Sequence, residues 1–205
     1  MPAKEVSFPV LPHLFCLVSA ADDLSLIEDL AAAGVDGFQV RDKAATTREL
    51  VELSRIVIAV ARPAGAMVVV DDRLDVALAV GADGVHLGAH DLAVADARRL
   101  APDLVVGATC RDAAAVAAAQ ADGATYAGFG PVFETASKSG LPSPLGVDAI
   151  ATASGRLPLI AIGGIDIPRA RACRTAGAHG VAVIGSIWRH PDPVAAAKEL
   201  VAAVQ

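Results

Sequence analysis

The sequence predicts a single (β/α)8 TIM barrel of near-minimal length, and three observations lead to this fold class. Short apolar runs alternate with longer segments of helical period along the whole chain. A connection of the form Ala-rich segment, Gly or Asp-Gly turn and apolar run recurs between them. The chain has 205 residues, somewhat below the roughly 250 typical of this fold. Such alternation implies a parallel sheet with right-handed crossovers.

Eight apolar runs are the predicted strands. They span residues 13–19, 37–41, 66–71, 84–87, 104–110, 126–130, 157–163 and 180–185. Eight strand–helix units close more naturally into a barrel than they stay open, but an open doubly wound sheet is the alternative arrangement. No linker rich in Pro, Gly or Ser divides the chain. We therefore expect residues 1–205 to form one domain, in which residues 1–12 are an N-terminal extension.

Helical period is clearest in four segments between the runs, at residues 46–61, 112–121, 168–176 and 192–204. Asp112 and Asp192 stand where N-cap residues are expected, and Pro168 suits a first helical turn. Glycines that suit helix C-termini precede three of the strands, at Gly34, Gly81 and Gly177.

Composition excludes several classes of protein. The net charge of −6 gives no electrostatic support for a nucleic-acid partner. No apolar run approaches the roughly 18 residues of a membrane span, and the N-terminus lacks the apolar core of a signal peptide. Three dispersed cysteines argue against a disulfide framework or a zinc site. We expect a cytoplasmic protein without a membrane partner, and a homo-oligomer is one arrangement that the sequence permits.

In a barrel of this kind the active site lies at the carboxyl ends of the strands. The polar and glycine residues predicted to meet there are Gln39, Arg41, Asp42, Lys43, Asp71, Asp72, His86, Asp91, Thr109, Arg111, Thr135, Ser137, Lys138, Gly163, Gly164, Gly185 and Ser186. We interpret His86 as a packed strand residue.

Glycines follow the last two strands, as Gly163-Gly164 and Gly185-Ser186. Such glycines let backbone N–H groups approach a phosphate closely, and the paired arrangement favours a phosphate site over simple chain turns.

Cations come from separate loops, with Arg41 and Lys43 after the second strand and Lys138 after the sixth. Strand alternation places Gln39, Arg41 and Lys43 toward the barrel interior if Phe38 and Val40 face the helices. Solvated surface charge is the alternative interpretation. Convergence of these cations in an acidic protein favours a small-molecule substrate with more than one phosphate.

Asp72 and Asp91 end neighbouring strands and suit an Mg²⁺ ion that keeps several waters and bridges diphosphate oxygens. Asp91, and Asp72 or Asp71, could instead be N-caps of the helices that follow. The cations nearby favour the metal site.

The connection over residues 130–146 is long and rich in Gly, Pro and Ser, which predicts a lid over the mouth. A loop without function is the alternative. The sequence shows no Ser-His-Asp order and no lysine in an apolar pocket that would indicate covalent catalysis.

The motifs QVRDK, DDRLDVALAVGADGVHLGAHDL, GFGPVFETASK, AIGGI and GAHGVAVIGSI, in this order, resemble the thiamine phosphate synthase family over about residues 13–190. The resemblance implies a (β/α)8 transferase of thiamine biosynthesis. Such an enzyme joins 4-amino-2-methyl-5-hydroxymethylpyrimidine diphosphate to a thiazole phosphate and releases pyrophosphate with Mg²⁺. The implied mechanism is dissociative, since pyrophosphate leaves first and the thiazole nitrogen attacks the resulting carbocation.

The resemblance also implies site residues. The pyrimidine diphosphate would be bound by Gln39, Val40, Arg41, Asp42, Lys43, Asp71, Thr109 and Lys138. The thiazole phosphate would be bound by Thr135, Ala136, Ser137, Gly164, Ile184 and Gly185. Asp72 and Asp91 would hold Mg²⁺, and Arg41, Lys43 and Lys138 would act catalytically by neutralising the leaving diphosphate.

Four positions depart from the family pattern. Asp71 replaces Asn, Thr109 replaces Ser, Ser137 replaces Thr and Gly185 replaces Ser. The thiazole tautomerases are a close relative, and the FETASKSGL segment resembles theirs as well. Arg111 and Asp91 point back to the synthase, because the tautomerases are expected to have a histidine and no second metal carboxylate there. A catalytically silent binder of thiazole or thiamine phosphate is a third hypothesis.

Overall fold

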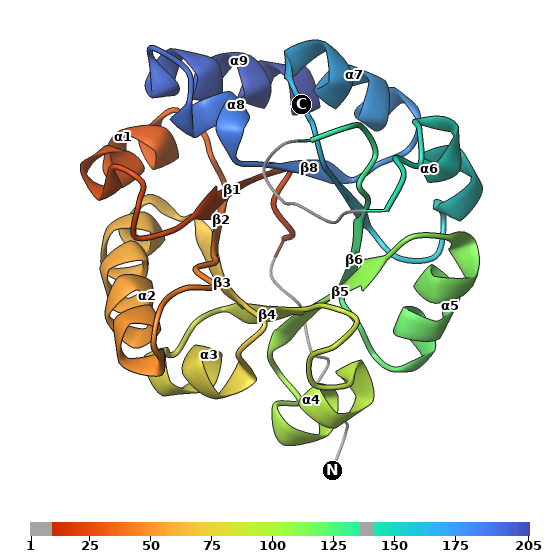
Figure 1. Ribbon diagram of the computed structural model, residues 1–205, viewed down its shortest axis with the longest axis horizontal. Helices are drawn as coiled ribbons and strands as arrows, with labels where there is room; N and C mark the ends of the chain where they lie inside the picture. The colour runs from red at the N-terminus through yellow and green to blue at the C-terminus, as the bar shows by residue number, and fades with distance from the viewer. Residues whose placement is uncertain (1–9, 136–141) are drawn as a thin grey trace.

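The computed structural model describes residues 10–135 and 142–205 and confirms the predicted (β/α)8 barrel. Within these residues, eight parallel strands pair in chain order, and β8 pairs back with β1 to close the barrel. Figure 1 looks along the barrel and shows the helices as an outer ring around the strands. The alternative of an open doubly wound sheet is therefore wrong.

The strands are short and the helices surround them. The strands are β1 (Leu14–Val18), β2 (Gly37–Val40), β3 (Met67–Asp71), β4 (Gly84–Leu87), β5 (Val105–Cys110), β6 (Tyr126–Phe129), β7 (Leu159–Ile162) and β8 (Gly180–Val183). The helices of the described residues are α1 (Ile27–Ala32), α2 (Thr47–Ala61), α3 (Leu74–Val80), α4 (Val94–Leu100), α5 (Ala113–Ala121), α6 (Asp148–Ala153), α7 (Ile167–Thr175), α8 (Gly185–Trp188) and α9 (Pro193–Val204), with 3₁₀ turns at Leu24–Leu26 and Arg62–Ala64.

Two apolar layers follow from the alternation of side chains along each strand. Phe38 and Val40 belong to the outer layer between the strands and the helices, as predicted. Phe15, Val69 and Ile160 belong to a smaller cluster that fills the inside of the barrel. The buried polar side chains of Gln39 and Asp71 lie beyond this inner cluster, toward the carboxyl ends of β2 and β3.

Side-chain caps begin the helices where the sequence predicted them. Asp112 accepts a hydrogen bond from the backbone N–H of Ala115, and Asp192 does the same for Ala195. Pro168 lies in the first turn of α7, and Gly81 ends α3 with a φ of 64°. These ends set where each strand starts and where each loop leaves the barrel.

The strand register aligns four residues in one row across the barrel. Asp71 pairs with His86, His86 with Gly107, and Gly107 with Tyr126. Thr109 lies one inward position higher on β5 and pairs with Gly128 of β6. This row and the position above it form the floor of the site described next.

No helix in the described part of the chain is long and apolar enough to cross a membrane. All three cysteines are buried and free.

Candidate active site

A cavity of about 740 Å³ opens at the carboxyl ends of the strands, a size typical of small-molecule sites. It brings together most of the residues predicted to meet at the mouth. Those that line it are Gln39, Arg41, Lys43, Asp71, Asp72, His86, Asp91, Thr109, Arg111, Thr135, Gly163, Gly164, Ile184, Gly185 and Ser186. We refer to it as the mouth cavity.

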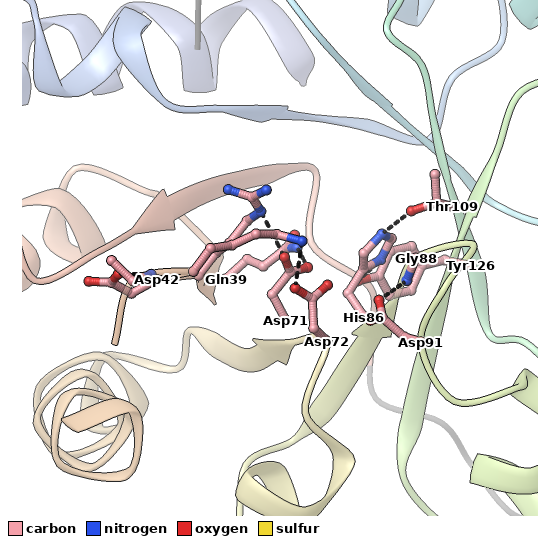
Figure 2. A network of polar contacts seen from close by, with 12 residues as sticks. Gln39, Asp42, Asp71, Asp72, His86, Gly88, Asp91, Thr109 and Tyr126 are labelled. Atoms are coloured by element: carbon pink, nitrogen blue, oxygen red, sulfur yellow. Dashed lines mark hydrogen bonds and ion pairs between the residues drawn. The ribbon is translucent and has the colours of Figure 1, made fainter. Parts of the chain in front are cut away.

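Asp71 ends β3 and is almost fully buried, with 7% of its surface exposed. One carboxylate oxygen accepts a hydrogen bond of 2.6 Å from Gln39 Nε2, and the other lies 2.8 Å from Arg41 Nε. Burial raises the pKa of Asp71 above its ordinary value, and the charge of Asp72 adds to the rise, although Arg41 and Gln39 oppose it. Asp71 therefore holds Gln39 (Figure 2) and Arg41 in place at the end of β3.

Asp72, the next residue, adopts a left-handed backbone conformation. It is the only non-glycine residue with positive φ in the described part of the chain, at 64°, a conformation that Asp tolerates better than most residues. Its carboxylate lies 2.9 Å from Lys43 Nζ. Burial alone would raise the pKa of Asp72, but hydrogen bonds with Lys43 and Asp91 and the nearby positive charges lower it. The turn points Asp72 toward Asp91, which follows the neighbouring strand β4 (Figure 2).

Asp91 closes the loop after β4, since its Oδ2 accepts a hydrogen bond of 2.7 Å from the backbone N–H of Gly88. Neither Asp72 nor Asp91 caps a helix. Arg73 and Ala93 are the N-cap residues of α3 and α4, and neither helix has a side-chain cap. The alternative interpretation of Asp91, and of Asp72 or Asp71, as N-caps is wrong, because another residue holds the N-cap position of each helix.

His86 lies on the floor of the mouth cavity and joins two strands beyond its own. Its Nδ1 is 3.1 Å from the Tyr126 hydroxyl, and its Nε2 is 3.1 Å from Thr109 Oγ1. The His86 and Tyr126 rings stack with centroids 5.6 Å apart. The expectation of a packed strand residue covers only part of this role, since His86 also lines the cavity.

The predicted phosphate cradle lies at the ends of β7 and β8. Gly163 and Gly164 have φ values of 100° and 63°, which only glycine adopts readily. A Cβ at Gly164 would lie 2.2 Å from the carbonyl oxygen of Glu134, and one at Gly163 would lie 2.5 Å from Pro131 Cβ. The glycines are therefore required for the close packing of this corner, and they leave backbone groups facing the cavity.

Two cations that the sequence did not single out also line the cavity, Arg169 of α7 and Arg189 after α8. Arg169 donates a 2.7 Å hydrogen bond to the carbonyl of Gly164, and its guanidinium lies 4.7 Å from the centre of the Phe133 ring. Arg189 packs against Gly185, where an ideal Cβ would be 3.3 Å from its guanidinium carbon. The sequence did not indicate them, because only residues at strand ends were expected at the mouth, whereas Arg169 lies in α7 and Arg189 directly follows α8.

Some predicted site residues lie elsewhere. Val40 is fully buried in the outer layer, so only its backbone faces the loop after β2. Asp42 accepts hydrogen bonds from the backbone N–H groups of Ala20 and Ala44 and points away from the acids in Figure 2. Ala136, Ser137 and Lys138 lie outside the described residues, and so does the middle of the predicted lid.

The described parts of that connection are attached to the barrel. The backbone N–H groups of Val132 and Phe133 bond to the carbonyls of Ile162 and Gly163, and Leu145 bonds back to Pro131. Arg111 donates to the carbonyl of Ser143 across the mouth. The connection therefore starts and ends beside the phosphate cradle, as a cover for the cavity would. Its role as a lid stays a prediction.

A closed (β/α)8 barrel with paired acids, several cations and a glycine cradle at one mouth defines a phosphate-binding barrel enzyme. The sequence model of thiamine monophosphate synthase matches residues 10–187. The chain belongs to the thiamine monophosphate synthase family, which confirms the resemblance found in the sequence.

Individual relatives agree. The chain is 41% identical over 198 residues to a thiamine-phosphate synthase of Chlorobium luteolum, covering 93% of both proteins. It is 45% identical over 205 residues to a thiamine biosynthesis bifunctional protein of Symbiobacterium thermophilum. That match covers 98% of this chain and 43% of the longer bifunctional protein. A solved thiamine phosphate pyrophosphorylase from Pyrococcus furiosus superposes with a TM-score of 0.85 at 33% identity, covering 93% of this chain and 94% of that one.

Proposed function

We propose that this chain is a thiamine-phosphate synthase, a transferase that joins the pyrimidine diphosphate to the thiazole phosphate and releases pyrophosphate. The observation that carries the proposal is the convergence of Asp71, Asp72 and Asp91 with Arg41 and Lys43 in one cavity, beside a glycine cradle. Family membership supports it, because the relatives of similar length carry this name.

The donor set fits a Mg²⁺ ion. Asp72 and Asp91 come from neighbouring strand ends and interact directly. Within the described ranges, no three or more His, Cys, Asp or Glu side chains converge as a metal site. Two carboxylates suit Mg²⁺, which keeps several waters and takes substrate phosphates as further ligands. When bound, the ion would neutralise charge on the departing diphosphate.

Arg41 and Lys43 would bind the diphosphate oxygens. Each forms an ion pair with one acid, Arg41 with Asp71 and Lys43 with Asp72. These ion pairs hold both cations in the cavity where the diphosphate would bind. The bond from the pyrimidine methylene carbon to oxygen breaks with both electrons leaving on pyrophosphate, and the thiazole nitrogen then supplies the pair for the new bond. Charge neutralisation is the main demand of this chemistry, and no protein nucleophile is needed. Lys138 would add a third cation from the connection after β6.

Gly164, Ile184 and Gly185 would present backbone groups to the thiazole phosphate, and Thr135 lines the same cavity. Ala136 and Ser137 would bind the same phosphate. Arg169 and Arg189 add positive charge on the same side of the cavity. A cytoplasmic location and a homo-oligomeric state remain predictions.

One assay separates this proposal from the two alternatives. The chain is incubated with both half-substrates, with and without Mg²⁺, and thiamine phosphate is measured. We expect metal-dependent product. Tautomer exchange of the thiazole carboxylate without product would establish the tautomerase, and product binding without turnover would establish the silent binder. Asp91 beside Asp72, together with Arg111, favours the synthase.

A further inference from the structure

Three side chains on the cavity floor form a hydrogen-bonded chain to which the proposed function assigns no joint role. Tyr126 of β6 bonds to His86 of β4 at 3.1 Å, and His86 bonds to Thr109 of β5 at 3.1 Å. Tyr126 is 1% exposed and stacks on Phe15 on its other side, with ring centroids 5.7 Å apart. Thr109 is exposed to the cavity. The chain therefore runs from the packed interior of the barrel to the place where substrate binds.

Two glycines make room for this arrangement. A Cβ at Gly107 would lie 2.2 Å from Tyr126 Cζ and 2.5 Å from His86 Nδ1. A Cβ at Gly128 would lie 2.6 Å from His86 Cε1. Gly107 sits between His86 and Tyr126 in the row of the strand register, so the two rings meet directly above it. Any larger residue at either position would push the imidazole away from Thr109.

The two ring nitrogens of His86 each lie 3.1 Å from one hydroxyl, Nδ1 from that of Tyr126 and Nε2 from that of Thr109. A neutral imidazole has one nitrogen that donates and one that accepts. The identity of its donating nitrogen therefore decides which way the hydrogen bonds of Tyr126 and Thr109 point.

Tyr126 decides between the two tautomers. Burial raises the pKa of its phenol, and the nearby Asp71 carboxylate adds to the rise, so the hydroxyl keeps its proton. Within residues 10–135 and 142–205, His86 is its only hydrogen-bond partner. If His86 Nδ1 carried a proton, the buried phenol proton would lack an acceptor, and an unsatisfied buried donor is strongly unfavourable. The phenol therefore donates to Nδ1, and Nε2–H donates to Thr109 Oγ1.

Because Thr109 Oγ1 accepts the hydrogen bond from His86, the Thr109 hydroxyl proton can be donated to a ligand in the mouth cavity. We propose that Tyr126 and His86 are positioning residues that fix Thr109 as a hydrogen-bond donor to a ring nitrogen of the pyrimidine substrate. The inference rests on the proposed function, which supplies the pyrimidine. It explains why a threonine can serve at this position, since the arrangement requires a hydroxyl and not a particular side chain.

The tautomer can be measured without turnover. The protein is labelled with ¹⁵N-histidine, and the His86 signals are assigned by their loss in His86→Gln. We expect the proton on Nε2 and none on Nδ1 at neutral pH, and a mixture of tautomers in Tyr126→Phe. A proton on Nδ1 in the unaltered protein would overturn the inference, whatever the enzyme catalyses.

Kinetics test the consequence. In Thr109→Val and in Tyr126→Phe we expect the KM for the pyrimidine diphosphate to rise roughly 5- to 30-fold, the range for loss of one hydrogen bond, with a smaller change in kcat. Tyr126→Phe should change KM less than about twofold when Thr109→Val is already present, because both act through one bond. Thr109→Ser should restore KM to within about threefold.

Thr175→Val is the control, because it removes a hydroxyl that bonds to the Arg171 carbonyl on α7, outside the cavity. An undiminished effect of Tyr126→Phe in the Thr109→Val background would contradict the inference. If the unaltered protein forms no thiamine phosphate, the proposed function fails, and the tautomer measurement still decides the hydrogen-bond arrangement.

Discussion

At the scale of residues, the two adjacent acids after β3 have different partners and different tasks. Asp71 is buried and holds Gln39 and Arg41, whereas Asp72 adopts positive φ and faces Lys43 and Asp91. The sequence predicted acids at this strand end, but it could not separate their roles, because the separation depends on a backbone turn between them. It also could not show that Asp71 forms an ion pair with Arg41, one of the cations expected to bind the diphosphate.

We predict that Asp71→Asn lowers the KM for the pyrimidine diphosphate, by roughly threefold to tenfold and most strongly at low Mg²⁺. Asparagine still offers an oxygen to Gln39 or Arg41, but it removes the negative charge that pairs with the guanidinium, so Arg41 attracts the diphosphate more strongly. Steady-state kinetics over a range of Mg²⁺ concentrations measure the effect.

Asp75→Asn serves as the matched control, since Asp75 is an exposed carboxylate that pairs with Arg73 outside the mouth cavity. A higher KM in Asp71→Asn than in this control would show that the Asp71 charge assists binding.

At the scale of elements, sequence patterns located every strand, and their boundaries were less accurate. The run 157–163 was predicted as a strand, but β7 covers Leu159–Ile162. Pro158 has no N–H to donate to a neighbouring strand, and Gly163 turns away with positive φ. Helix starts were predicted well where a side chain caps them, as at Asp112 and Asp192, because a cap is a local interaction.

We predict that Asp192→Ala destabilises the protein by about 1 kcal/mol and leaves KM unchanged. The substitution removes the acceptor for the Ala195 N–H at the start of α9, a loss that typically costs roughly 0.5–2 kcal/mol. Urea unfolding measures it, and Asp192→Asn, which keeps an acceptor, should lose only a few tenths of that. Equal stability of Asp192→Ala and the unaltered protein would mean that the cap contributes nothing.

At the scale of the whole molecule, barrel closure is what brings distant segments into one site. The sequence predicted which strand ends would meet, since the fold places all of them at one mouth. It missed Tyr126, which was taken only as part of an apolar strand, although its inward position on β6 could have been counted from Gly128. It missed Arg169 and Arg189 because side chains from α7 and α8 reach back over the rim, which depends on tertiary packing.

The central claim is that the Asp72–Asp91 pair holds Mg²⁺ for departure of the diphosphate. Asp72→Asn and Asp91→Asn test it with little disturbance, because Asn tolerates positive φ at 72 and keeps an acceptor for the Gly88 N–H at 91. The measurement is the rate of thiamine phosphate formation as a function of Mg²⁺ concentration, with Asp75→Asn as control. We predict that each variant needs roughly tenfold more Mg²⁺ or more for half its maximal rate, and that high Mg²⁺ recovers much of the loss. A loss of rate that is equal at every Mg²⁺ concentration would contradict the claim.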